Sequence, residues 1–474
     1  MIDRILSNLG SLHRKVGAMT AARAISTIAA LVVMIFLTRI LDPADYGAYK
    51  KLWLIFLIFS PAITNMLVKT LYYRGEITDR GIAIWTNLTA GTVLSGIITL
   101  MVAGGGHILA ELVQSPEIAS ALRWFSLYIF FATFSSLAEP VFVLAQRKKW
   151  LVGYSFGYNI IEACLIIIPF YLGYPLETVA LIMVGGPVLR TFCLIYIARK
   201  TATVPVFSEI TKELPASLSY AFGVLMIFIT GIGIAQIDKL IIATWFESDE
   251  LYAIYVVGAQ TIPVIPAFIS SVSSAIVVQY AAQISRKELS PAVDAIKSAT
   301  SRLYLIVTPI VVVCFFLAEP IMVVLFDQYA ESAPIFRIYV LTTMYKLFLA
   351  DAFLLASGKT RVLTAFNAAE IVFNIPLSIF LIQYFGILGP ALATLIAHFT
   401  AVIALILYVS KTENIKSSAF LPSKNIWPLL VSLPALGAVS WMLLTSGLPY
   451  IIMVGIGGSL CAIIIAIHNR KFVT

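Results

Sequence analysis

The chain contains fourteen apolar stretches, each long enough to cross a lipid bilayer as a helix of about 20 residues. They cover residues 19–41, 46–68, 82–104, 120–145, 151–173, 176–198, 217–244, 251–281, 303–326, 334–357, 361–385, 387–409, 426–446 and 448–468. A composition of 60% hydrophobic and 12% charged residues excludes a soluble globular protein. The sequence therefore predicts an all-α, polytopic membrane protein with about fourteen transmembrane helices.

The lysines and arginines are concentrated in alternate links between these stretches. Of the 32 such residues, 23 lie at the termini and in the links on one predicted side. The opposite, external links carry five, namely Arg39, Lys50, Lys51, Arg123 and Arg337. Positively charged links favour the cytoplasmic side, so we expect both termini in the cytoplasm and a location in a bacterial or archaeal inner membrane. The same distribution explains the net charge of +8 without a nucleic-acid partner.

A short polar motif occurs twice within apolar stretches. Residues 158–162 read Tyr-Asn-Ile-Ile-Glu, and residues 366–370, which begin 208 positions later, read Phe-Asn-Ala-Ala-Glu. A weaker echo at an offset of 211 brings Glu139 within one residue of Asp351. Because six stretches precede the central basic link, these echoes predict two parallel six-helix lobes, related by an axis along the membrane normal, with a central cavity.

The predicted organisation has five parts. They are an interfacial amphipathic helix over 1–18, an N-terminal lobe over 19–198, a cytoplasmic linker over 199–216, a C-terminal lobe over 217–409, and a final helix pair with a cytoplasmic tail over 410–474.

The repeated motif places an amide and a carboxylate on one helix face, because three residues make about one helical turn. Insertion of a charge at the centre of a membrane helix costs about 2.5 to 3.5 kcal/mol on translocon scales. We therefore expect Asn159, Glu162, Asn367 and Glu370 to line an aqueous cavity. The alternative is that each pair forms a hydrogen-bonded clasp between helices.

Three segments resemble the polysaccharide-transporter branch of the multidrug/oligosaccharidyl-lipid/polysaccharide exporter superfamily. They are residues 37–49, which read LTRILDPADYGAY, the triplet Ile237-Asp238-Lys239, and residues 385–393, which read FGILGPALA with Pro390 where a small residue is usual. The resemblance implies a Wzx-type flippase of lipid-linked oligosaccharides that works by alternating access. It does not indicate which glycan is carried.

Apart from the lysines and arginines assigned to the links, four cations remain within the predicted helices, namely Arg23, Arg190, Lys239 and Lys346. A row of cations suits the diphosphate of an isoprenoid-linked sugar, because arginine offers paired donors and lysine a mobile charge. Alternatively, Arg23 could extend to the cytoplasmic surface and Lys239 could pair with nearby acids. The aromatic side chains of Tyr154 and Tyr158, on the Asn159 helix, could stack on sugars or simply pack.

Five carboxylates accompany these cations, namely Glu139, Glu162, Asp238, Asp351 and Glu370. Some must neutralise the cations, and one left over could bind a coupling proton or sodium ion. We expect no other cofactor and no metal site, because the four cysteines are scattered singly.

Other functions compete with this interpretation. A cation-coupled multidrug exporter and a lipid II flippase belong to the same superfamily, and a membrane-embedded glycan polymerase or ligase is a more distant alternative. No catalytic triad or nucleotide-binding loop is visible, so we expect a transporter rather than an enzyme. Its expected partners are the lipid-linked substrate, the bilayer and, potentially, a glycan polymerase and other polysaccharide-assembly proteins.

Overall fold

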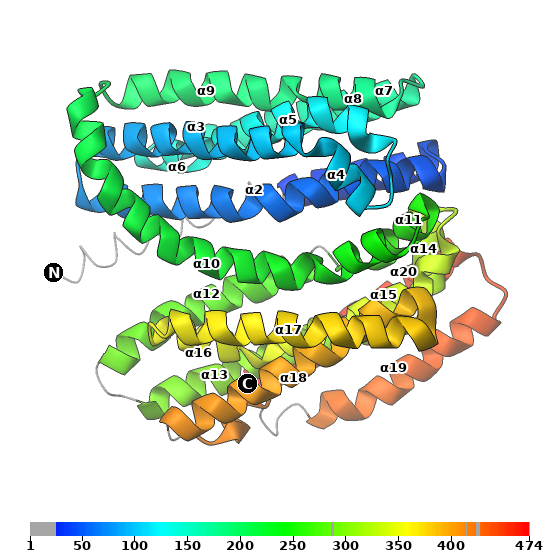
Figure 1. The fold of residues 1–474 in the computed structure, drawn as a ribbon. Coiled ribbons are helices and arrows are strands. Elements are labelled where there is room, and N and C mark those ends of the chain that lie inside the picture. Colours follow the sequence, from blue (N-terminus) through cyan, green and yellow to red (C-terminus); the bar gives the residue numbers. More distant parts are fainter. Residues whose placement is uncertain (1–24, 263, 286–288, 414, 423–426, 474) are drawn as a thin grey trace. The chain divides into compact units, whose positions relative to one another are not determined.

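The computed structural model describes residues 25–473, apart from 263, 286–288, 414 and 423–426. The amphipathic helix expected over 1–18 and the predicted site residue Arg23 lie outside the described residues. The described part of the chain is helical without a strand (Figure 1). It divides into two compact units: unit 1 comprises the described residues up to Gln236 with Ala243–Glu250, and unit 2 comprises Ile237–Ile242 with the described residues from Leu251.

Unit 1 begins with an apolar helix over Ile25–Ile40. Its further helices are α2 (Pro43–Ile77), α3 (Arg80–Gly104), α4 (Gly106–Leu112), α5 (Ile118–Ser135), α6 (Ala138–Leu144), α7 (Lys148–Tyr171), α8 (Leu176–Met183), α9 (Gly185–Thr201) and most of α10 (Phe207–Trp245).

Unit 2 contains most of α11 (Asp249–Gly258) and the helices that follow it. These are α12 (Val264–Ser285), α13 (Leu289–Phe316), α14 (Ala318–Phe326), η1 (Ala330–Ser332), α15 (Ala333–Thr342), η2 (Thr343–Phe348), α16 (Ala350–Ala356), α17 (Thr360–Phe385), η3 (Gly386–Leu388), α18 (Gly389–Glu413), η4 (Ser417–Phe420), α19 (Trp427–Thr445) and α20 (Tyr450–Val473).

The prediction of an all-α membrane protein is confirmed. Among the described residues, nine helices are long and apolar enough to cross a membrane, and the bent pair Ala330–Phe348 and Ala350–Ala356 would make a tenth. One of the nine, Thr360–Glu413, joins α17 and α18 through η3, and Ile25–Ile40 and Leu429–Thr445 are shorter apolar helices. Each of the fourteen predicted stretches overlaps one helix or a run of consecutive helices.

Several predicted elements differ from the structure, since the stretches at 120–145, 176–198, 251–281, 303–326 and 334–357 each contain more than one helix. At 303–326, the first helix, α13, begins earlier than predicted, at Leu289. It ends at Phe316, and a second helix, α14, follows with a Glu-Pro pair in its first turn. The charged residues that precede 303 hid the true start of α13. The linker expected over 199–216 is mostly helical, since α9 continues to Thr201 and α10 begins at Phe207.

The helix boundaries repeat along the chain. The short helices α6 and α16 begin at residues 138 and 350, an offset of 212, and α7 and α17 begin at 148 and 360, the same offset. Helices α3 and α13 end at residues 104 and 316, again 212 apart.

Left-handed backbone positions repeat in the same way. Positive φ angles occur in pairs 212 or 213 residues apart: Gln114 and Asp327, Gln146 and Gly358, Gly173 and Gly386. Since such angles are uncommon outside glycine, their recurrence marks equivalent turns in the two series of helices. The offset is one helical turn longer than the 208 of the sequence motif, so Asn159 is the twelfth residue of α7 whereas Asn367 is the eighth of α17.

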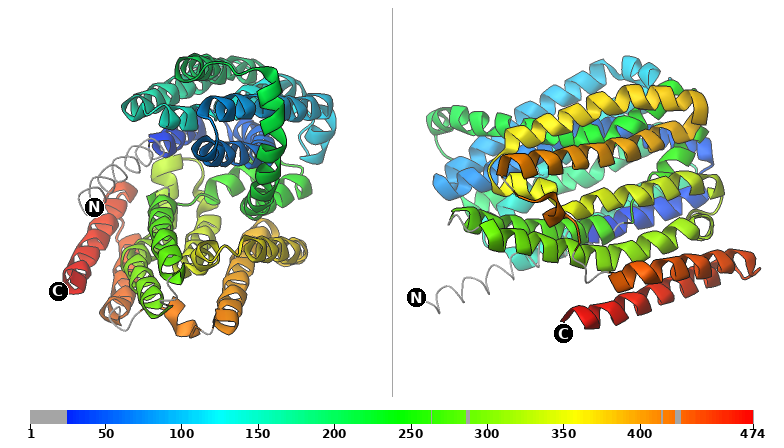
Figure 2. Two further views of the ribbon diagram at one scale, coloured as in Figure 1. Left: turned by 90° about the vertical axis from the view of Figure 1, so that its left-hand side faces the viewer. Right: turned by 90° about the horizontal axis from the view of Figure 1, so that it is seen from below.

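The last two helices pack on unit 2 through small residues. A side chain at Gly457 of α20 would come within 2.5 Å of Leu317, and one at Gly437 of α19 within 2.8 Å of Phe316. Helices α19 and α20 lie side by side (Figure 2), and both contact α13. Their opposite faces expose large apolar side chains such as Trp441 and Ile451, as expected for a surface in contact with lipid.

Candidate functional site

A polar cluster inside unit 1 is built around Arg190 of α9. Its Nε donates a hydrogen bond to the Tyr154 hydroxyl at 3.0 Å, and its guanidinium lies 4.8 Å from the ring centre of Tyr158. Tyr154 and Tyr158 are one turn apart on α7, and their rings stack at 6.4 Å. In the described part of the chain, no ion pair to Arg190 is formed by an Asp or Glu. Its charge is therefore held by aromatic groups, which leaves guanidinium N–H groups for a further acceptor.

The carboxylate of Glu162 belongs to the same cluster. It accepts a hydrogen bond from the Tyr128 hydroxyl of α5 at 2.5 Å, and lies close enough to Arg190 to interact electrostatically. Asn159 turns elsewhere: its amide donates to Ser26 of the first helix at 2.9 Å and to the Ser155 carbonyl at 2.6 Å. The two polar residues of the first motif thus contact two different neighbouring helices.

Unit 2 contains a second cluster around Asp238. This carboxylate is 1% exposed and accepts hydrogen bonds from the hydroxyls of Tyr255, at 2.7 Å, and Tyr339. The ammonium of Lys239 lies 3.3 Å from the Asp238 carboxylate and 3.3 Å from the Tyr339 hydroxyl. Lys239 is therefore neutralised by its sequence neighbour, which is the alternative considered from the sequence.

A third cluster joins η2, α17 and α18 in unit 2. The Glu370 carboxylate contacts Nδ1 of His398, and both side chains are 9% exposed. The Tyr345 ring stacks on the His398 imidazole at 4.2 Å between centroids, with 29° between the planes. The next residue, Lys346, is exposed, and its ammonium lies 5.7 Å from the Tyr345 ring centre.

The remaining predicted site residues are less closely gathered. Asp351 is exposed in the first turn of α16 and interacts electrostatically with Lys346. Glu139 is half-buried at the equivalent position of α6, in unit 1. Asn367 is half-buried on α17, one turn before Glu370.

His398 was missed by the sequence analysis, although a single imidazole near the middle of an apolar stretch is itself a signal. The tyrosines Tyr128, Tyr255 and Tyr339, which bind the embedded carboxylates, were also missed. Nothing in their spacing could have shown these contacts, because each joins two different helices and depends on how those helices pack.

Lys51 was assigned to an external link, yet its side chain is completely buried. It forms an ion pair of 2.5 Å with Asp249, and Asp249 also accepts from the Ser115 hydroxyl at 2.8 Å. One turn earlier, any side chain at Gly47 would overlap the Asp249 carbonyl oxygen. The Tyr-Gly-x-Tyr motif that supported the family resemblance therefore allows close packing of α2 against the start of α11.

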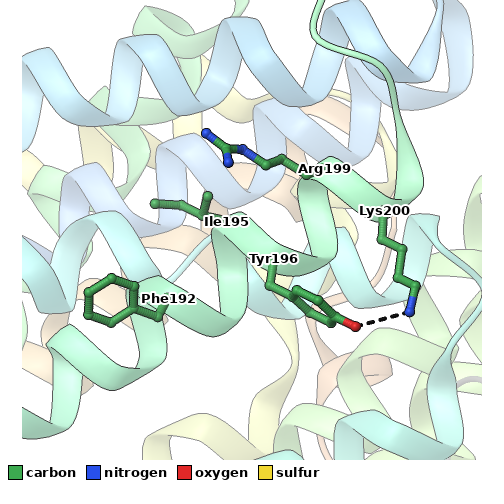
Figure 3. Close-up of a pocket in the computed structure, with 5 residues that line it drawn as sticks. All are labelled: Phe192, Ile195, Tyr196, Arg199 and Lys200. Carbon is green, nitrogen blue, oxygen red and sulfur yellow. Dashed lines mark hydrogen bonds between the residues drawn. The ribbon is translucent and has the colours of Figure 1, made fainter.

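A pocket lies on the surface of α9, and none of the predicted site residues lines it (Figure 3). Its lining comes from the last three turns of this one helix: Phe192, Ile195, Tyr196, Arg199 and Lys200. Lys200 donates to the Tyr196 hydroxyl at 3.0 Å. Exposed aromatic rings next to basic residues at a helix end are typical of the membrane–water interface.

No group of three or more potential metal ligands is found among the described residues. The polar clusters of both units are instead built from pairs of charged and aromatic side chains. They can hold an anion or exchange a proton, and they lack the ligand number that a metal ion requires.

Comparison of the sequence with known protein families gave a match. The model of a family described as polysaccharide biosynthesis protein matches residues 36–334, which is more than half of the chain. A search of curated protein sequences gave no match.

Several solved structures share the fold. One described as the lipid II flippase MurJ in an inward closed conformation has a TM-score of 0.68 and 17% identity, over 96% of this chain and 99% of that one. A eukaryotic MATE transporter has a TM-score of 0.62 and 15% identity, over 87% and 98%. A Vibrio cholerae MATE transporter has a TM-score of 0.61 and 13% identity, over 87% of this chain and 99% of that one. At these identities the similarity establishes the fold, and the substrate has to be argued from the site.

Proposed function

Because the chain belongs to the polysaccharide biosynthesis protein family, within the multidrug/oligosaccharidyl-lipid/polysaccharide exporter superfamily, we propose that it is a flippase for an isoprenoid-diphosphate-linked oligosaccharide. It moves the repeat unit of a surface polysaccharide, such as O-antigen, from the cytoplasmic to the outer leaflet of the inner membrane. The proposed cycle is alternating access, with both termini cytoplasmic. A glycan polymerase is the expected recipient of the product.

The observation that carries this proposal is the state of Arg190. An arginine held by Tyr154 and Tyr158, without a carboxylate ion pair in the described residues, keeps its charge available inside a membrane helix. The planar guanidinium binds a phosphate oxygen pair in a bidentate manner, and the two tyrosines fix its orientation. Lys346 is an exposed cation of unit 2, and we propose it as a separate contact for the diphosphate head group.

The related functions differ in how well they use this cluster. A cationic drug would be repelled by Arg190, which disfavours a multidrug exporter despite the shared fold. Lipid II also carries a diphosphate, so the cluster suits a lipid II flippase equally well, and only the identity of the family model favours polysaccharide precursors. The distinction requires an experiment in cells.

Deletion of the gene should abolish surface polysaccharide while the cell wall stays intact. Complementation with Arg190→Ala should reduce export at least about tenfold, because a hydrogen bond to a charged group contributes about 1.5 to 3 kcal/mol. Arg190→Lys should retain part of the activity, since it keeps the charge and loses the bidentate geometry.

Arg123→Ala is the matched control, because Arg123 is an exposed arginine of the same unit outside the cluster. It should complement as well as the wild type. Export that is unaffected by Arg190→Ala at equal expression would refute the role of the cluster, and a cell-wall defect on deletion would point to lipid II instead.

A further inference from the structure

The Glu370 and His398 pair lies deep in the predicted membrane region. Glu370 is the eleventh residue of α17, so it lies about 15 Å along the helix from its start, near the middle of a hydrocarbon core of about 30 Å. His398 is the tenth residue of α18, which packs along α17 (Figure 1). A carboxylate and an imidazole are thus in direct contact at a depth where each charge is costly.

The net charge of this pair depends on one proton. With neutral imidazole the pair carries one negative charge, and addition of a proton gives a carboxylate–imidazolium pair with none. A low dielectric favours the form of the pair that has no net charge, so the pair has a physical reason to take up a proton. The Tyr345 ring stacked on His398 favours the imidazolium further, through its π face.

The partner of the carboxylate favours a proton over a sodium ion. Sodium is bound by oxygen ligands, whereas Glu370 is met by an imidazole nitrogen. An imidazole in contact with a carboxylate is a proton acceptor, and it titrates in the physiological range more readily than other side chains.

We propose that Glu370 and His398 together bind the coupling proton of the transport cycle. The proton adds to the imidazole, and the carboxylate keeps its charge as the partner. This proposal rests on the flippase function, because the link to the substrate passes through η2. Tyr345, which stacks on His398, and Lys346, the proposed diphosphate contact, are consecutive residues of this short 3₁₀ helix.

The backbone next to Lys346 is suited to such a link. Leu349, between η2 and α16, has a φ of +53°, which a leucine adopts only under constraint. The two segments it joins are bent by 41°. A change at the His398 ring therefore reaches Lys346 through Tyr345 within η2, directly before this strained junction.

Other titratable groups lie on the elements that pack against the pair. Tyr345 of η2 stacks on His398, Lys346 of η2 interacts electrostatically with Asp351 of α16, and Tyr408 on α18 packs its ring on Phe366 of α17.

The first test measures the proton site without transport. Full-length protein with ¹⁵N-labelled histidine is reconstituted in nanodiscs, and the ring signals are followed with pH; His398→Gln assigns the His398 signal among the four histidines. We expect the His398 ring signals to change with pH. Glu370→Gln should move the midpoint of that change to lower pH, because the imidazolium loses its counter-charge.

The matched control is Glu331→Gln, since Glu331 is an exposed carboxylate of the same unit on η1. It should leave the His398 midpoint in place. A His398 signal that does not titrate, or a midpoint that Glu370→Gln does not move, would overturn the proposal.

The second test separates this proposal from the flippase function. A labelled isoprenoid diphosphate is used as the probe in proteoliposomes, and its flipping rate is compared with and without a pH gradient. The wild type should respond to the gradient, and in His398→Gln the ratio of the two rates should fall to about one. If the wild type moves no probe while His398 titrates with Glu370, the flippase proposal fails and the proton site stands. If His398→Gln responds to the gradient as the wild type does, the coupling role is wrong.

Discussion

At the residue scale, Lys51 shows how this chain keeps a charge that is fully out of contact with solvent. Its ammonium pairs with Asp249 and lies 3.3 Å from the Gln114 carbonyl oxygen. Glu117 is close by, and its hydrogen bond to Asp249 is the main cause that raises the pKa of Glu117. Lys51 is therefore the buried cation that neutralises a small acidic cluster, and it does not act as an exposed residue of an external link.

Removal of Lys51 should destabilise the protein strongly. We expect Lys51→Met to cost about 3 to 5 kcal/mol, because Asp249 would be left as a buried charge without its counter-ion. The double variant Lys51→Met/Asp249→Asn should be less destabilised than either single variant. The measurement is thermal unfolding in detergent, with Lys50→Met as the control, since the half-buried Lys50 lies against tyrosine rings. Equal losses for Lys50 and Lys51 would contradict this account.

The sequence predicted the components of the Arg190 cluster better than their contacts. Tyr154, Tyr158 and Glu162 share a face of one helix, so their spacing was enough to group them. Arg190 joins them from α9, and that contact depends on how two helices pack, which spacing along either helix does not contain. For Lys239, pairing with a nearby acid was considered from the sequence, whereas its contact with Tyr339, 100 positions away, depends on helix packing.

At the scale of helices, hydropathy predicted where spans occur and failed where polar residues continue a helix beyond the bilayer. Helix α2 has 35 residues, about 52 Å at 1.5 Å per residue, so it extends well past a hydrocarbon core of about 30 Å. The charged residues near the end of α2 suggested that the helix ended earlier. The structure shows that Arg74, in the last turn, is instead paired with Glu213 of α10. Such ion pairs allow a helix to continue beyond the point at which hydropathy alone predicts its end.

The repeated left-handed turns give a prediction for the element that precedes α7. Gln146 has a φ of +58°, and its counterpart Gly358, before α17, has +70° with no atom within 4 Å of the point where a Cβ would lie. Gly358→Gln should therefore destabilise by about 1 kcal/mol through backbone strain alone, and Gln146→Gly should stabilise by a similar or smaller amount.

Chemical or thermal unfolding of the purified variants would measure both changes. Gly223→Gln is the control, because Gly223 lies inside α10 with open space around it and without a positive φ. It should cause no loss of stability. A loss of stability for Gln146→Gly, or no loss for Gly358→Gln, would show that the two turns are not equivalent.

At the scale of the whole chain, the number of membrane crossings decides on which side each polar group works. The fourteen crossings predicted from the sequence would place both termini on one side, and the basic residues Arg199 and Lys200 at the end of α9 favour the cytoplasm for the link that follows them. The link between α19 and α20, at 446–449, would then lie outside, and the C-terminus inside. The apolar runs of α19 and α20 carry no charge and give no independent orientation signal, so this pair is the least constrained part of the topology.

Reporter fusions would test this orientation. A phosphatase that is active only outside the cytoplasm should be inactive when fused within 202–206 or after the last residue, and active when fused within 446–449 or 114–117. The physical reason is that basic links resist translocation, whereas the two outer links carry no Lys or Arg. Activity at both 446–449 and the C-terminus would mean that α20 does not cross the membrane. The substrate path proposed here would survive that result, because Arg190 and Lys346 lie before α19, whereas the count of fourteen crossings would not.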